Sequence, residues 1–316
     1  MNNLISLFFS KLKNKFKAVL SKKTENVFPF LRPKLTLPEG LTEQKLFSYL
    51  KSVLVSDAPP QEMINYCTHD FRRFVYTYGL VKGMSGRVLE LGANPYFTTF
   101  LIKEFTSLEL TLANYFGSTI SDSNIEQKVF YQDLQSGQPK ETCLSSYHFN
   151  VEEENFPFSD QEFDVILFCE IIEHLLMDPV AVLKEIKRVM KPNGVLILTT
   201  PNVSRLENVA KMISGANIYD PYSGYGAYGR HNREYNKHEL YLLLEYLGFE
   251  IDTIFTADVH ANASEYYTSI SKLQPLIESR KDDLGQYIFV KAINKKPPKT
   301  KKPLFLYRSY PPEELE

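Results

Sequence analysis

Short apolar runs alternate with helical stretches along the middle of this chain. The runs resemble strands buried on both faces, and between them apolar residues recur at the spacing of amphipathic helices. The predicted strands lie at residues 88–91, 108–113, 129–131, 147–149, 165–168, 195–199, 249–256 and 286–292. This alternation predicts an α/β fold with a mostly parallel sheet and helices on both faces.

The first strand–turn–helix unit spans residues 87–105. Its apolar strand ends at Gly92, where a sharp turn needs freedom from a Cβ atom. In such units a ligand lies over the carboxyl end of the strand. Gly92 stands without the further glycines of a dinucleotide site, and Glu90 could meet a cationic or amino group instead of a phosphate. A turn that binds nothing also fits this pattern.

Two segments precede this unit. Residues 1–25 form a basic amphipathic segment, with lysines on a helix that has apolar residues near one face. Such a helix can lie on an anionic membrane, or it can pack on its own domain. Residues 26–84 comprise a proline-containing linker and a helical cap, with helices predicted at 41–54 and 61–80. These helices either cover the following cleft or extend its core.

Composition narrows the class of protein only slightly. The formal net charge of −2 gives no general bias toward nucleic acid. The three cysteines, Cys67, Cys143 and Cys169, show no C-x-x-C spacing and suggest neither a disulfide framework nor a zinc site. No apolar run is long enough to span a bilayer. We therefore expect a cytoplasmic protein, with peripheral contact at the inner face of a membrane through residues 1–24 as an open alternative.

The densest group of motifs lies between residues 156 and 202. Pro179 suits a helix start, and Pro192-Asn193-Gly194 turns the chain into the strand at 195–199. The chain here resembles the class I S-adenosylmethionine-dependent methyltransferases, of the type 11-like kind, over roughly residues 85–290. The matching motifs occur in the family's order and spacing: Glu90-Leu-Gly92, Phe156-Pro-Phe158, Phe163-Asp-Val165, Glu173-His174-Leu175, Lys191-Pro-Asn-Gly194 and Thr200-Pro-Asn202.

The resemblance implies a Rossmann-like, seven-stranded, mostly parallel sheet with an antiparallel edge strand, in a domain spanning 85–294. It also implies S-adenosylmethionine as the methyl donor. Glu90 would accept a hydrogen bond from the ammonium group of this cofactor, Asn114 would bind its ribose, and Asn150 its adenine amino group, with Glu152 as an alternative. The neutral Asn114 lacks the charge of the usual acid, which weakens the bond. The implied cofactor-binding residues are Glu90, Gly92, Asn94, Asn114, Asn150, Val151, Glu152 and Cys169.

Carboxylates and imidazoles gather after the strand at 165–168. If residues 170–174 are helical, Glu170, Glu173 and His174 share one face. With His231 they could hold Mg²⁺ or Mn²⁺, which would orient an acceptor hydroxyl and lower its pKa. Some methyltransferases that act on vicinal or ring hydroxyls, or on RNA 3′ ends, resemble this arrangement. Without a metal, His174 or His231 could act as the general base, and a purely structural role for Glu173 and His174 also fits.

The loop at residues 219–230 contains glycine, proline and several tyrosines. It could stack on sugar rings, close over the cofactor as a lid, or pack on its own domain. Arg230 and Arg233 add positive charge, which would suit a phosphorylated or carboxylated substrate. Beyond residue 294, the lysine- and proline-rich composition predicts a disordered tail over 295–316.

These observations favour methylation of a hydroxyl on a glycan, a lipid-linked sugar or a ring-containing small molecule, with S-adenosylmethionine as donor. Two alternatives stay open. Asn94, Tyr96 and Asn114 motivate a catalytically inactive methyltransferase-like binding or scaffold protein. The four-ligand pattern motivates a metal-dependent 2′-O-methyltransferase of RNA 3′ ends, although the core domain carries no basic stripe and nucleic acid is not the expected partner.

Overall fold

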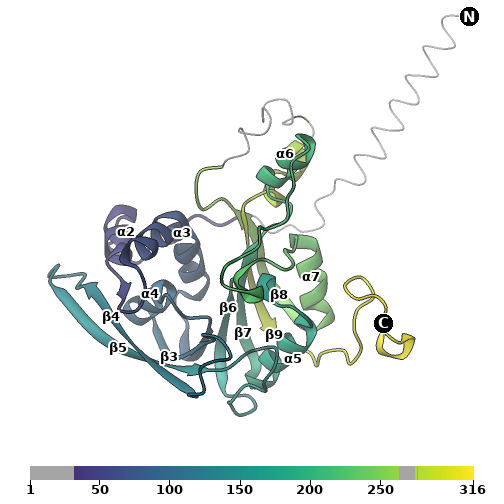
Figure 1. Cartoon of the computed structure of the whole chain (residues 1–316), viewed down its shortest axis with the longest axis horizontal. Helices are drawn as coiled ribbons and strands as arrows, with labels where there is room; N and C mark the ends of the chain where they lie inside the picture. Colours follow the sequence, from purple (N-terminus) through teal and green to yellow (C-terminus); the bar gives the residue numbers. More distant parts are fainter. Residues whose placement is uncertain (1–31, 263–274, 276) are drawn as a thin grey trace, which may run out of the picture.

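A nine-stranded mixed sheet forms the centre of the computed structural model (Figure 1). The structure describes residues 32–262, 275 and 277–316, so the basic segment predicted at 1–25 lies outside the described residues. The strands are β1 (Leu54–Val55), β2 (Ser85–Leu91), β3 (Ser107–Asn114), β4 (Asn124–Gln132), β5 (Pro139–His148), β6 (Phe163–Cys169), β7 (Met190–Pro201), β8 (Phe249–Ala257) and β9 (Tyr287–Asn294). Their order is β1-β4-β5-β3-β2-β6-β7-β9-β8.

The centre of the sheet is parallel and both of its edges are antiparallel. Strands β5, β3, β2, β6 and β7 run parallel, whereas β9 pairs antiparallel with both β7 and β8. The predicted α/β class and the antiparallel pairing of the last two strands at one edge of the sheet are confirmed. The sheet is larger than the expected seven strands because β1 and β4 extend the opposite edge. There β4 and β5 form a long hairpin where the sequence indicated only short strands at 129–131 and 147–149.

Helices cover both faces of the sheet. They are α2 (Glu43–Lys51), α3 (Pro60–Val81), α4 (Phe97–Phe105), α5 (Pro179–Val189), α6 (Leu206–Ile213) and α7 (Lys237–Tyr246). Side chains of β2 alternate between faces: Leu89 and Leu91 join the apolar cluster of α5 and α7, and Val88 joins the cluster of α3 and α4. Among the helices of the described ranges, none is both long and apolar enough to cross a membrane.

The two cap helices extend the core. Helix α2 begins after Thr42, whose Oγ1 accepts a hydrogen bond from the Lys45 amide (3.2 Å), and α3 begins at Pro60. Both lie beside α4 (Figure 1), and Phe74 of α3 packs against Phe97 of α4 with ring centroids 5.1 Å apart. The cap is therefore continuous with the apolar interior.

The C-terminal segment 295–316 packs on the domain, in contrast to the disordered tail that its composition predicts. The Tyr307 side chain is buried and its hydroxyl bonds to the Asp178 carboxylate at the start of α5, which Lys302 also contacts. Leu306 and Leu315 pack against the cluster beneath α5 and α7. These apolar residues, spaced among lysines and prolines, anchor a segment that looks unstructured by composition.

Candidate active site

The turn after β2 lies at the carboxyl ends of the parallel strands. Gly92 has φ of +66°, and a Cβ atom there would lie 3.0 Å from the Ile171 Cδ1 atom. Its amide donates to the Ala113 carbonyl (2.8 Å), which ties the turn to β3. The Asn94 amide donates to Asn114 Oδ1 (2.7 Å). Both the backbone conformation and the approach of Ile171 therefore favour glycine at this position.

A cavity of about 180 Å³ opens beside this turn. Four of the residues predicted to bind the cofactor lie in its wall, namely Gly92, Asn114, Asn150 and Val151. The side chain of Asn114 is already engaged, since its Oδ1 accepts from Asn94 and its Nδ2 donates to the Tyr96 hydroxyl (3.3 Å). Of the lone pairs on Asn114 Oδ1, one is therefore left for a ribose hydroxyl.

The other predicted cofactor residues do not line this cavity. Glu90 is buried, accepts from the Thr99 hydroxyl (2.6 Å), and has its pKa raised to about 8 by that burial. The Asn94 side chain donates to Gln127 Oε1 (3.0 Å). Glu152 accepts from the amides of residues 176–178, which places its carboxylate at the loop before α5. Cys169 packs in the apolar cluster on the α3 face of the sheet.

Two aromatic residues in the cavity wall, Tyr115 and Tyr228, were not among the predicted cofactor residues. Their rings meet edge to face with centroids 5.9 Å apart, and Tyr115 stacks on His148. The Asn150 Nδ2 atom donates to the Tyr228 hydroxyl (3.1 Å). Tyr115 could have been found as the residue that directly follows Asn114 at the strand end. Tyr228 belongs to the tyrosine loop that the sequence indicated.

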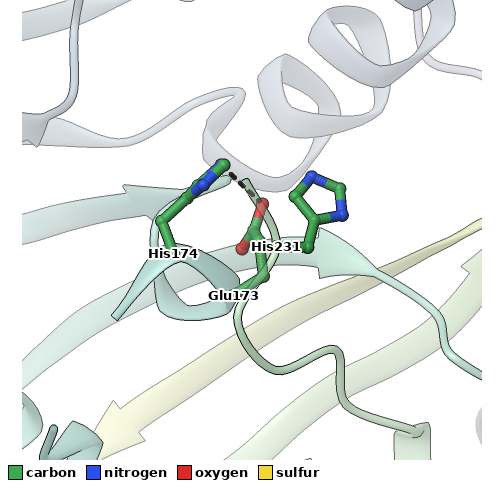
Figure 2. A group of neighbouring side chains, drawn as sticks. All are labelled: Glu173, His174 and His231. Atoms are coloured by element: carbon green, nitrogen blue, oxygen red, sulfur yellow. Dashed lines mark ion pairs between the residues drawn. The ribbon is translucent and has the colours of Figure 1, made fainter. Parts of the chain in front are cut away.

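Glu173, His174 and His231 form one compact group (Figure 2). One ligating atom from each lies within 4.8 Å of the others, and His174 Nε2 lies 3.8 Å from Glu173 Oε1. Glu170 is not part of this group. Its φ of +55° turns the chain before the short 3₁₀ helix η1 (Ile172–His174), so the expected helical face does not form. Its Oε1 instead accepts from the Thr199 hydroxyl (2.7 Å).

Hydrogen bonds orient both imidazoles. His174 Nδ1 bonds to the Arg230 carbonyl (2.9 Å), and His231 Nδ1 bonds to Glu234 Oε1 (2.8 Å). Since Nδ1 carries the proton in each bond, the Nε2 lone pair is left available. Glu173 Oε2 accepts from the Thr200 hydroxyl (2.9 Å), whereas its Oε1 is buried without a hydrogen-bond partner. The group thus presents unengaged acceptor atoms.

Burial dominates the electrostatics of this group. It raises the pKa of Glu173 to about 7, against the opposing effect of His231. It lowers the pKa of His174, and the neighbouring His231 lowers it further. For His231, burial lowers the pKa, but the bond to Glu234 and the charge of Glu173 outweigh it and the net pKa is raised. His231 is therefore the more basic imidazole.

A second, polar cavity of about 190 Å³ includes His231 in its wall, whereas His174 lines the first cavity. The two imidazole rings meet edge to face with centroids 5.0 Å apart. Glu173, His174 and His231, named the acid–base group below, therefore lie between the two cavities. Neither Arg230 nor Arg233 lines either cavity: Arg233 pairs with Glu239, and the Arg230 guanidinium lies over the Tyr222 ring.

Helix α3 supplies a buried cation next to the first cavity. Arg73 Nη1 lies 4.0 Å from Glu170 Oε1, and Arg73 Nη2 lies 3.6 Å from Asp70 Oδ2. Burial raises the pKa of Glu170 to about 8, while Arg73 opposes that shift. The cap thus contributes directly to the charge at the cavity wall.

Comparison with known proteins gives consistent matches. Residues 63–254 match a methyltransferase domain family. A stretch of 105 residues is 33% identical to a protein of Mycolicibacterium smegmatis named "Probable S-adenosylmethionine-dependent methyltransferase", and it covers 33% of this chain and 35% of that relative. A solved S-adenosylmethionine-dependent methyltransferase from Archaeoglobus fulgidus has a TM-score of 0.43 at 20% identity, over 71% of this chain and 90% of that chain. One from Mesorhizobium loti has a TM-score of 0.40 at 11% identity, over 69% and 95%.

Proposed function

Because the chain belongs to the class I S-adenosylmethionine-dependent methyltransferases, we propose that it methylates a hydroxyl oxygen of a sugar or other ring-containing acceptor. The observation that carries this proposal is the position of Glu173, His174 and His231 between the two cavities. An alcohol needs a base to take its proton as its oxygen becomes a nucleophile, and this group supplies one.

Each cavity takes one reactant. The cavity beside Gly92 takes S-adenosylmethionine, which supplies an electrophilic methyl group on a sulfonium. Gly92 allows close backbone approach, and Asn150 and Tyr115 lie where an adenine ring needs an amide and a flat aromatic neighbour. Glu170 lies in the same wall, and its Oε1 is 4.0 Å from Arg73 Nη1, which adds polar groups to one side of this cavity. The protein aligns the two reactants for in-line displacement.

His231 is the base in this proposal. Its Nδ1 is held by Glu234, which fixes the tautomer and stabilises the imidazolium that forms, as carboxylates do for catalytic histidines elsewhere. The acceptor oxygen forms a bond to the methyl carbon, the carbon–sulfur bond breaks, and sulfur keeps the electron pair. The hydroxyl proton passes to His231 Nε2 and then to water.

The same group of residues is also suited to bind a divalent cation, and one observation favours this second function. Glu173 Oε1 is buried without a hydrogen-bond partner, and each histidine bonds through Nδ1 to an oxygen atom, as metal-ligating histidines do. Glu173, His174 and His231 would hold Mg²⁺ or Mn²⁺, which would lower the pKa of an acceptor hydroxyl. Metal binding by these residues is also what the alternative function, 2′-O-methylation of RNA 3′ ends, would require.

Calorimetric titration with S-adenosylhomocysteine, in chelator and again in manganese, tests the proposal. The wild-type protein should bind, and Gly92→Val should lose binding because the added atoms meet Ile171. Gly137→Val is the matched control, since Gly137 also has a positive φ but has open space around its Cβ position. Failure of the wild-type protein to bind would favour the scaffold alternative.

A second assay tests the chemistry. Methyl transfer from labelled S-adenosylmethionine to hydroxylated acceptors should be lost in His231→Asn, while binding of S-adenosylhomocysteine persists. Transfer to RNA ends, and not to sugars, would instead support the RNA alternative.

A further inference from the structure

The polar cavity beyond His231 has walls that select the chemistry of its ligand. Every lining side chain except that of Pro201 offers a hydrogen-bonding group. The residues that matter are Arg205, Glu207, Asp220, Glu234, His260 and Tyr287. Such walls suit a ligand with several hydroxyls and would leave an apolar ring with unpaired polar groups around it.

The charges in this wall are negative or already paired. Among the lining residues that the structure describes, Arg205 is the only arginine or lysine. It bonds to the Glu234 carboxylate and to the Asn202 carbonyl. Glu207 pairs with Lys211 (2.8 Å). Asp220 accepts a hydrogen bond from the backbone amide of His231 (3.0 Å). A phosphate or carboxylate would therefore meet three carboxylates, together with Arg205 and His231, which are both already bonded to Glu234, so the wall disfavours anions.

Exposed aromatic rings lie next to this cavity. Tyr219 and Tyr222 flank the lining residue Asp220 in the sequence and are 84% and 93% exposed, and Tyr225 on the same loop is 85% exposed. Several large aromatic side chains exposed on one loop suggest a contact surface, whereas a single exposed residue would not. Tyrosine presents a flat, partly apolar face that covers the C–H face of a sugar ring, with a hydroxyl for its rim.

We propose that this cavity is the acceptor subsite and that it takes a neutral polyhydroxylated ring, such as an uncharged sugar residue, with the adjoining ring on Tyr219 and Tyr222. This proposal rests on the function proposed above and names its substrate class. A hydroxyl in the cavity can reach His231, while the other hydroxyls bind carboxylates that accept from them and groups that donate to them.

Binding of small glycosides by the full chain, saturated with S-adenosylhomocysteine, tests the proposal. The probes are the methyl glycosides of neutral hexoses and of a disaccharide, together with the matching uronates and sugar phosphates. Neutral glycosides should bind at least about fivefold more tightly than the anionic ones. In Asp220→Asn this difference should narrow, because the amide oxygen still accepts from His231 but the charge is gone.

The tyrosines are tested with the disaccharide. Tyr219→Ala combined with Tyr222→Ala should weaken its binding about threefold to tenfold and leave the monosaccharide unaffected. Tyr310→Ala is the control, since Tyr310 is partly exposed on the C-terminal segment, outside the residues that line the cavity. Binding to phosphatidylglycerol vesicles that requires the two tyrosines, with disaccharide binding unchanged, would overturn their role.

Two failures are distinguishable. If the protein binds S-adenosylhomocysteine but binds anionic sugars as well as neutral ones, or binds no neutral glycoside at tens of millimolar, the acceptor assignment is wrong and the cofactor site stands. If S-adenosylhomocysteine itself does not bind, the proposed function is overturned, and the acceptor assignment with it.

Discussion

Arg73 of α3 and Glu170 at the end of β6 face one another across the join between the cap and the sheet, with Nη1 and Oε1 4.0 Å apart and both side chains buried or nearly so. The pair links a helix that precedes the sheet to the wall of the cavity beside Gly92. Arg73 also contacts Asp70 and the Tyr66 hydroxyl, so one guanidinium satisfies several groups.

Replacing Arg73 should destabilise the protein far more than replacing its neighbour. Arg73→Met leaves Asp70 and Glu170 without their buried cation and should lower the free energy of unfolding by about 3 kcal/mol. Arg72→Met removes only an exposed pair with Glu43 and should cost about 0.5 kcal/mol. Urea denaturation of both variants measures the difference, and equal losses would contradict the role assigned to Arg73.

Glu90 should make stability fall as pH rises. Its pKa is about 8 in the folded protein, above the ordinary value of 4.5, because it is buried. Between these values the folded state keeps a proton that the unfolded state releases, so the free energy of unfolding decreases with pH. Glu90→Gln should flatten the decline between about pH 5 and pH 8. Glu170 and Glu173 act with the same sign, so part of the slope will remain.

The measurement is denaturant unfolding across that pH range. Glu109→Gln is the control, since Glu109 is exposed on the neighbouring strand β3 and should leave the slope unchanged. A variant Glu90→Gln with the wild-type slope would show that the carboxyl does not hold its proton.

If the acid–base group binds a metal, manganese should stabilise the protein through Glu173. Protein stripped with a chelator should gain in melting temperature on addition of Mn²⁺, because only the folded state assembles the ligands. Glu173→Gln should abolish the gain. Glu170→Gln should keep most of it, since Glu170 lies outside the group. The absence of any shift in the wild-type protein would leave His231 acting without a metal.

Glu234 should control the pH dependence of methyl transfer. The rate in chelator should rise with pH as His231 loses its proton, with a midpoint above the ordinary histidine value because Glu234 raises that pKa. Glu234→Gln removes the carboxylate, so the midpoint should move to lower pH and the maximal rate should fall. His231→Asn should cost about 100-fold or more.

Initial rates with labelled S-adenosylmethionine and a neutral glycoside give these profiles. Glu239→Gln serves as the control, because Glu239 pairs with Arg233 away from both cavities. An unchanged midpoint in Glu234→Gln would argue against His231 as the base.

The C-terminal segment should contribute to stability. Tyr307→Ala removes a buried ring and should cost about 3 kcal/mol, whereas Tyr307→Phe removes only the hydroxyl bonded to Asp178 and should cost about 1 kcal/mol. Tyr310→Ala should cost less than either. Thermal unfolding ranks the three variants, and a Tyr307→Ala protein as stable as wild type would mean that the segment does not pack.

Local sequence signals predicted the parts of the fold that depend on near neighbours. Apolar runs indicated the central strands, and Gly92 indicated the turn, because both depend on burial and backbone freedom at single positions. The full length of the β4–β5 hairpin was not predicted. Its strands are largely exposed and polar, so the alternation of apolar and polar residues along them is weak. The packing of the C-terminal segment was not predicted either, because the few residues that hold it in place contact residues more than a hundred positions away.

The site was predictable where side chains follow strand ends and unpredictable where the backbone turns. His174 and His231 lie close together, as the motifs predicted. Glu170 lies outside the group because its own left-handed backbone conformation breaks the helical spacing that the prediction assumed. Glu152 was assigned to the cofactor by its position in the sequence, but the amides before α5 take its carboxylate. Such competition between backbone and ligand for one side chain is set by tertiary structure.

The bond from Asn150 to the Tyr228 hydroxyl joins the cavity beside Gly92 to the loop that carries Asp220. A ligand that fixes Asn150 also fixes that loop, and a ligand held by the loop restrains Asn150 in return. The two binding equilibria are then thermodynamically linked, and linkage is reciprocal: whatever factor the donor adds to acceptor affinity, the acceptor returns to the donor. With the two cavities assigned as we propose, each reactant should therefore favour the binding of the other.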